Sequence, residues 1–90
     1  MKPGVKKMQF GVRVRTSAKK FAISYKNNTG IIIHATEKAQ RNRVNIEITK
    51  ELTLIFNLRV IIRAGLNSRD KIIEVEGNEE EILQRLHSIF

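Results

Sequence analysis

The apolar residues in the middle of the sequence recur with a spacing that decides what this chain can fold into. They fall at steps of four, four and three residues, at Val44, Ile48, Leu52 and Ile55. This spacing is the period of one face of an α-helix, and Phe56 extends the same face. The pattern therefore predicts a helix over residues 43–56, with one apolar side turned towards a core.

The same segment also contains an alternation that would suit a strand. β-Branched residues stand at positions 44, 46 and 48. Lys50 and Glu51 interrupt this alternation, however, and a strand over the whole segment would be unusually long. We therefore choose the helix, which leaves Ile46 and Leu54 outside its apolar face.

Five shorter segments alternate apolar and polar residues, which is the period of a half-buried β-strand. These segments cover residues 8–14, 21–25, 31–35, 58–64 and 71–76. The turn residues Asn27-Asn28-Thr29-Gly30 separate the second and third segments, and the loop 65–70 separates the last two. We predict an antiparallel hairpin at each of these two turns.

A second helix is predicted at the C-terminal end of the sequence. Asn78 is a good N-cap, and Glu81 three residues later would complete a capping box. The apolar residues beyond it share one helical face: Ile82, Leu83, Leu86, Ile89 and Phe90. The order β-β-β-α-β-β-α predicts a two-layer α+β domain, with two helices on one face of a mixed four- to five-stranded sheet.

The length of 90 residues allows a single domain, which we place at residues 8–90 after a flexible lead-in at 1–7. The chain has no cysteine, which excludes disulfides, zinc–cysteine sites and thiol nucleophiles. No apolar run is long enough to span a membrane, and the N-terminus lacks the apolar region of a signal peptide. We therefore expect a cytoplasmic protein that makes no membrane contact.

The net charge of +8 is unevenly distributed. Residues 1–35 carry eight Lys or Arg and no acidic residue, whereas residues 46–90 carry six Lys or Arg and eight acidic residues. A basic first half predicts an anionic partner. The aromatic residues stand at apolar-periodic positions and are expected mostly in the core: Phe10, Phe21, Tyr25, Phe56 and Phe90. Contacts to nucleic acid would then be made to phosphates rather than by stacking on bases.

Two short motifs carry a resemblance to a known family. The segment Gly65–Ile73 reads Gly-Leu-Asn-Ser-Arg-Asp-Lys followed by two isoleucines, and Asn42–Asn45 reads Asn-Arg-Val-Asn. The first resembles the Gly-x-x-Ser-Arg-x-Lys motif of the YggU family. The second stands where that family has Gly-Lys-Ala-Asn at the start of its central helix, with departures at Asn42 and Val44. Val12-Arg13-Val14 followed by Ala18-Lys19 is a third match, in which Thr16 replaces a proline.

The resemblance covers roughly residues 8–86 and implies a YggU-like two-layer α/β fold, with a helix at 43–56. The loop before Asn45 is about two residues longer than in the family, and the family's prolines around Ala35-Thr36 are missing. The YggU family consists of small proteins of unknown function. The resemblance therefore implies a fold and no activity.

Three loops are expected at one end of the sheet. Hairpins reverse the chain and the central helix returns it, so the fourth strand must run in the same sense as the third. The loops 16–20, 36–42 and 65–70 then share this end with the start of the helix. Together they carry seven cations: Lys19, Lys20, Lys38, Arg41, Arg43, Arg69 and Lys71. Only Glu37 and Asp70 oppose them.

We predict an anion-binding corner where the helix start meets the loop 65–70. Its expected members are Arg43, Asn45, Ser68, Arg69 and Lys71, with Lys19, Lys20, Lys38 and Arg41 beside them. Arg69 would offer a bidentate fork and Lys71 a point charge, while Ser68 and Asn45 would orient the anion by hydrogen bonds. The free N–H groups at the helix start would add further donors.

Each of these residues also has a purely structural interpretation. Gly65 could be required for a positive φ in the turn, and Ser68 could cap that turn through its hydroxyl. Asn45 could bond to the neighbouring loop. Arg69 could pair with Glu37 or with carbonyls of the last helix. On the open sheet face, we expect only ordinary pairs, of Arg59 and Arg63 with Glu74 and Glu76.

The residue inventory favours a binding protein over an enzyme. A Ser-His-Asp set of His34, Ser68 and Asp70 is topologically possible, but no nucleophile elbow surrounds Ser68, and we expect His34 to pair on the open face. We predict no catalytic residue, no metal site and no cofactor. The leading hypothesis is a monomer that binds RNA or DNA weakly. The alternatives are a small-ligand protein or enzyme that uses residues 43–45 and 65–71, and a non-catalytic module for an acidic protein.

Overall fold

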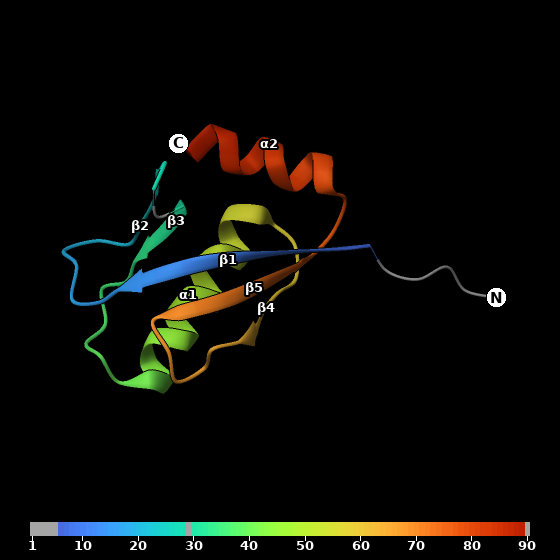
Figure 1. The fold of residues 1–90 in the computed structure, drawn as a ribbon. Helices are drawn as coiled ribbons and strands as arrows, with labels where there is room; N and C mark the ends of the chain where they lie inside the picture. The colour runs from blue at the N-terminus through green and yellow to red at the C-terminus, as the bar shows by residue number, and fades with distance from the viewer. Residues whose placement is uncertain (1–5, 29, 90) are drawn as a thin grey trace.

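The computed structural model of the chain describes residues 6–28 and 30–89, without the side chain of Arg41. The strands are β1 (Lys7–Arg15), β2 (Ala22–Lys26), β3 (Gly30–His34), β4 (Val60–Ala64) and β5 (Asp70–Glu76). The helices are α1 (Arg41–Phe56) and α2 (Glu79–Ile89). The observed order is β-β-β-α-β-β-α, so the α+β fold predicted from the sequence is confirmed (Figure 1).

The five strands form one mixed sheet in the order β2-β3-β1-β5-β4. The central strand β1 is parallel to β3 and antiparallel to β5. Both predicted hairpins are present, one formed by β2 and β3 and the other by β4 and β5. The first two strands are not neighbours, because β3 lies between β1 and β2. The pairings make β4 run in the same sense as β3, as the count of chain reversals predicts.

The N-terminal strand starts slightly earlier than its alternation suggests. β1 begins at Lys7, inside the segment expected to be a lead-in, and the Lys6 carbonyl accepts a 2.8 Å hydrogen bond from the Gly77 amide. The rest of that segment, residues 1–5, lies outside the described residues.

The helix α1 forms where the four-residue spacing predicts it, and it begins two residues before position 43. Its buried residues are Val44, Ile48, Leu52 and Phe56. Ile46 and Leu54 are 66% and 68% exposed, so they lie outside the apolar face as expected. The alternative of a strand at 44–48 is wrong, because burying every fourth residue against the sheet removes more apolar surface from water than the short alternation could.

The second helix begins with the predicted cap. The Asn78 Oδ1 accepts a 2.8 Å hydrogen bond from the Glu80 amide, and the Asn78 carbonyl accepts one from the Ile82 amide. Ile82 and Leu86 are buried, whereas Leu83 is exposed at the margin of the apolar face. Phe90, also expected on that face, lies outside the described residues.

Both helices pack on the same face of the sheet and share one core. The strand residues in this core include Val12, Val14, Ile33, Ile73 and Val75. Phe10 of β1 and Phe56 of α1 meet edge to face, with ring centroids 6.3 Å apart. This single core confirms the two-layer architecture, in which the helices cover one face and the other stays open.

One aromatic residue departs from the core prediction. Tyr25 is 55% exposed, although it stands at an apolar-periodic position of β2. Periodicity predicts the face on which a side chain lies, and β2 is an edge strand, where the cover of the helices ends. Phe10 and Phe21 are half-buried and Phe56 is fully buried.

The open sheet face carries the predicted ion pairs. Arg59 Nη1 lies 3.9 Å from Glu76, and Arg63 Nε lies 3.7 Å from Glu74. Glu74 is only 3% exposed, and its Oε1 also accepts a 2.8 Å hydrogen bond from Gln9 Nε2. On this face, acids of β5 therefore neutralise the arginines of β4.

Candidate anion-binding cleft at the loop end of the sheet

Three loops meet around the C-terminal end of β1. The Val14 amide donates to the Arg69 carbonyl at 2.7 Å, which ties the β4–β5 loop to β1. The Ala35 amide donates to the Arg15 carbonyl at 2.8 Å, and the Ser17 amide donates to the Glu37 carbonyl at 3.0 Å. The predicted convergence of the three loops at one end of the sheet is confirmed.

A cleft of about 750 Å³ opens between the start of α1 and the β4–β5 loop. One wall consists of residues of the first turn of α1 and the loop before it, and the other of residues 66–69. The charged residues that line it are Arg43, Arg69 and Lys71. Sequence-predicted residues from two separate segments therefore face one concave site.

The start of α1 is open towards this cleft. Its N-cap residue, Gln40, makes no side-chain capping bond, and the first turn contains no acidic residue. The first N–H groups of a helix have no partner within the helix, and they carry its positive dipole end. This wall of the cleft consequently offers donors that favour an anion.

The β4–β5 loop is held in one shape by Gly65. Its φ is +82°, and a Cβ at this position would lie 2.2 Å from the Asp70 carbonyl oxygen. The Gly65 carbonyl accepts a 3.0 Å bond from the Ser68 amide, and Ser68 Oγ accepts one from the Asp70 amide. The structural interpretation of Gly65 and Ser68 therefore holds, since both shape the turn.

Lys71 lies inside this corner rather than at its surface. It is 5% exposed, and its Nζ donates to the carbonyls of Gly65 and Leu66 at 2.8 and 3.4 Å. Burial lowers the pKa of the Lys71 ammonium below its ordinary value, because a charge loses hydration there. The sequence analysis expected Lys71 to offer a free point charge to an anion. In the structure, the Lys71 ammonium instead binds mainly to carbonyls of the loop.

Asn45 holds the same loop from the helix side. Its Nδ2 donates a 3.0 Å hydrogen bond to the Leu66 carbonyl, as the structural interpretation proposed. Its Oδ1 is buried without a partner among the described residues. Asn45 lines the neighbouring groove beside β4 rather than the cleft. The amide therefore joins α1 to the loop between the two hollows.

The two arginines of the cleft differ in their partners. Arg43 Nη1 lies 3.9 Å from Glu37, and both side chains are largely exposed, so the pair is weak. Arg69 is exposed, and among the described residues its guanidinium has no hydrogen-bond or ion-pair partner. The alternatives in which Arg69 pairs with Glu37 or with α2 are not observed. Arg69 is therefore the open cation of the cleft.

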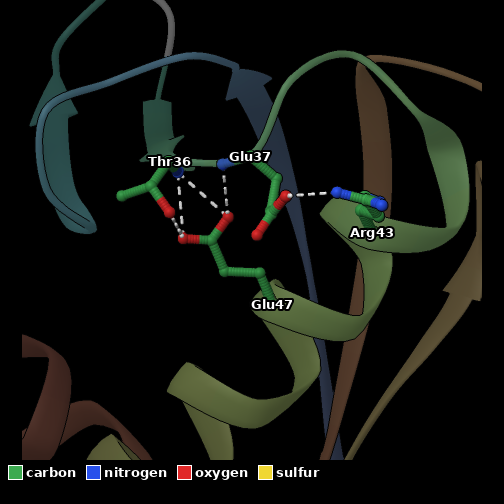
Figure 2. Close-up of polar contacts among 4 residues, drawn as sticks. All are labelled: Thr36, Glu37, Arg43 and Glu47. Atoms are coloured by element: carbon green, nitrogen blue, oxygen red, sulfur yellow. Dashed lines mark hydrogen bonds and ion pairs between the residues drawn. The ribbon is translucent and has the colours of Figure 1, made fainter.

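An acidic residue that the sequence interpretation did not place at this end is Glu47. Its carboxylate accepts bonds from the amides of Thr36 and Glu37 at 2.9 and 3.0 Å and from the Thr36 hydroxyl at 2.5 Å (Figure 2). Burial alone would raise the pKa of Glu47, but these hydrogen bonds outweigh it and lower the pKa. Glu47 lies one helical turn after Arg43, and this spacing is the only sequence signal of its position.

The remaining predicted cations lie on the neighbouring loops. Lys19, Lys20 and Lys38 are exposed, and the backbone bond between Ser17 and Glu37 holds their two loops together. Arg41 belongs to the first turn of α1, but its side chain lies outside the described residues. The loop end thus presents three exposed lysines in addition to the cations that line the cleft.

The proposed catalytic alternative has no geometric support. His34 Nε2 lies 3.0 Å from Ser24 Oγ across the β2–β3 hairpin, on the open sheet face. Ser68 Oγ is occupied by the turn. Within residues 6–28 and 30–89, no group of three or more His, Cys, Asp or Glu side chains could hold a metal ion.

The fold and the cleft together define a small two-layer α+β protein with a basic loop end. A comparison with known protein families and with curated proteins finds no match to the chain. The likeness to the YggU family accordingly rests on the three matching sequence segments alone. Neither helix of the described part is long and apolar enough to cross a membrane.

Proposed function

We propose that the cleft and the lysines beside it bind phosphate groups of RNA or DNA, weakly and with little sequence preference. The observation that supports this most is Arg69, an exposed guanidinium without a partner among the described residues, in a cleft whose opposite wall is the open start of α1. A guanidinium fork suits phosphate oxygens, and helix N–H groups add donors. Lys19, Lys20 and Lys38 extend the positive surface along the same end.

We also propose where the protein acts, its oligomeric state and its family. We place it in the cytoplasm as a monomer, and on the pattern of Gly65–Ile73 we propose kinship with the YggU family. The binding experiment does not depend on the location, the oligomeric state or the family.

The experiment is a titration with oligonucleotides of increasing length at several salt concentrations. Affinity should rise with length, and four to six phosphate contacts should give a log–log salt slope of about −3 to −5. A flat salt response, or no binding at about 50 mM salt, would remove the proposal.

Two substitutions localise the binding. Arg69→Ala should weaken it at least about threefold and reduce the salt slope by about 1. The matched control is Arg59→Ala, which removes the same charge from the open face beside Glu76 and should leave binding nearly unchanged. Equal losses in both variants would mean that net charge, and not the cleft, carries the affinity.

A second candidate is a compact anionic ligand, and the concave shape of the cleft favours it. Sulfate or a mononucleotide would then saturate the site, and longer oligonucleotides would bind no more tightly. The length series therefore separates the two candidates.

A further inference from the structure

The outer edge of β4 is free of partners in the described part of the chain. β4 pairs only with β5, and the Arg59 carbonyl accepts a 2.9 Å bond from the Glu76 amide. Backbone groups of successive residues in an antiparallel strand point alternately to the two sides. Arg59 and Ile61 therefore face β5, and Val60 and Ile62 turn their N–H and C=O groups to the free edge.

A mainly apolar groove of about 630 Å³ runs along this edge, between β4 and α1. Its α1 side presents Ile46 and Leu54, which are 66% and 68% exposed, and its loop end presents Leu66, which is 55% exposed. The strand side is formed by residues 60–62. Large exposed apolar side chains that gather around one hollow are characteristic of binding surfaces.

The two features together define the shape of the occupant. Unpaired backbone groups at every second residue match an added strand, whose own N–H and C=O groups have the same spacing. Alternate side chains of such a strand would point into the groove, against Ile46 and Leu54. A compact ligand could fill the hollow but would leave the edge of β4 unpaired.

We propose that the groove between α1 and β4 binds an extended segment of a partner protein, which adds to the sheet as a sixth strand and carries acidic residues beside Lys50.

The charges along the groove favour an acidic segment. Lys50 is exposed and, among the described residues, is the only ionisable one that lines it. Glu47 of the same helix points to Thr36 on the other side, and its carboxylate is already occupied. An acidic side chain in the added segment would therefore meet a cation and no competing carboxylate.

The arginines of β4 disfavour a second copy of this chain as the occupant. Two β4 strands paired antiparallel about Ile61 would place Arg59 of one copy opposite Arg63 of the other. Like charges directly opposite each other destabilise a strand pair, and each copy also carries a net charge of +8. A partner strand without basic residues at these positions avoids this repulsion.

The experiment uses two synthetic peptides of eight residues in which threonine alternates with the residues that face the groove. The groove-facing residues are isoleucine except at one central position, which is glutamate in one peptide and lysine in the other, so that this side chain lies beside Lys50. The glutamate peptide should perturb backbone NMR signals of Val60, Ile62 and Leu54, and should slow amide exchange at Val60 and Ile62. The lysine peptide should bind at least about tenfold more weakly.

Two substitutions sharpen the result. Lys50→Glu should reverse the preference towards the lysine peptide. Leu54→Gln should weaken binding of the glutamate peptide about tenfold, whereas Leu83→Gln, an exposed leucine of α2 outside the groove, should not.

Three outcomes would overturn the proposal. The first is no shift with either peptide up to about 1 mM. The second is a set of shifts confined to the loop end, which would assign acidic segments to the cleft instead. The third is a dimer in sedimentation that Leu54→Gln dissociates, because the edge of β4 would then be used by a second copy.

Discussion

The open face of the sheet and its loop end both carry arginines, but the two regions give them different surroundings. On the face, Arg63 and Arg59 of β4 stand beside Glu74 and Glu76 of β5. At the loop end, Arg69 has no partner among the described residues. The arginines of β4 therefore have acidic partners, whereas Arg69 has none among the described residues.

Strand register explains this difference. Paired strands hold neighbouring side chains of one face at fixed separations, so Glu76 and Glu74 of β5 lie beside Arg59 and Arg63 of β4. Loop residues have no such register, and none of the acids near the loop end pairs with Arg69 in the described part of the chain, since Glu37 lies 3.9 Å from Arg43. Glu47 binds backbone amides, and Asp70 lies 3.9 Å from Arg13. Net charge alone would not have distinguished the two surfaces.

The largest expected effect tests whether the loop end has one fixed shape. Gly65→Ala should lower the free energy of unfolding by about 2–4 kcal/mol, because its Cβ would meet the Asp70 carbonyl at a positive φ. Gly30→Ala is the control, since Gly30 has φ +74° but open space around it, and should cost about 1 kcal/mol. Equal losses in urea denaturation would show that the loop relaxes.

The next effect tests the pairing on the open face. Glu74→Ala should cost about 1–3 kcal/mol, because it removes a buried carboxylate and leaves the Gln9 amide without its acceptor. Arg63→Ala removes the exposed partner and should cost less than about 1 kcal/mol. A larger loss for Arg63→Ala would mean that the ion pair, and not the burial of the acid, stabilises this face.

A pH-dependent effect is expected for Glu47. Glu47→Gln should cost about 1 kcal/mol at neutral pH, because the carboxylate accepts bonds from Thr36 and Glu37. Its pKa is lowered in the folded protein, so its stabilisation is complete above the unfolded pKa and is lost as the pH falls through the folded one. Denaturation at pH about 7 and about 3 should show the difference shrinking.

Glu51→Gln serves as the control for this pH series. It lies one turn further along α1, and no hydrogen bond holds its side chain among the described residues. An equal loss in both variants would contradict the role assigned to the Glu47 carboxylate.

The smallest expected effect concerns Arg69. Arg69→Ala should change the free energy of unfolding by less than about 0.5 kcal/mol, since its exposed side chain contacts no partner in the described chain. Thermal and urea denaturation measure this directly. A loss of about 1–3 kcal/mol with unchanged anion binding would make the arginine a structural residue.

The elements of the fold were predictable because their signals are local. The spacing of Val44, Ile48 and Leu52 specifies a helix, and alternation specifies each strand. Tyr25 shows the limit of this reasoning, since periodicity gives its face but not the extent of the helices above it. The position of β3 between β1 and β2 likewise depends on packing over the whole sheet.

The place of the candidate site and the structural roles of Gly65, Ser68 and Asn45 could be predicted from the sequence, but the role of Lys71 could not. Chain reversals bring the loops together, and this needs no side-chain detail. The direction of the Lys71 side chain depends on the shape of the β4–β5 loop, because the folded loop turns the Gly65 and Leu66 carbonyls towards the ammonium group. Sequence patterns do not give this shape. Glu47 was missed for a related reason, because its partners are backbone amides, which every residue carries.

The central position of β1 has a consequence for the way the chain reaches its native state. Lys7 at the start of β1 lies opposite Glu76 at the end of β5. The first and the last strand in the sequence are therefore neighbours in the middle of the sheet. Bringing them together closes a loop that contains β2, β3, α1 and β4, which costs more entropy and time than closing a hairpin. During synthesis, the β2–β3 hairpin and α1 emerge well before β5. The sheet can therefore be completed only after β5 has left the ribosome.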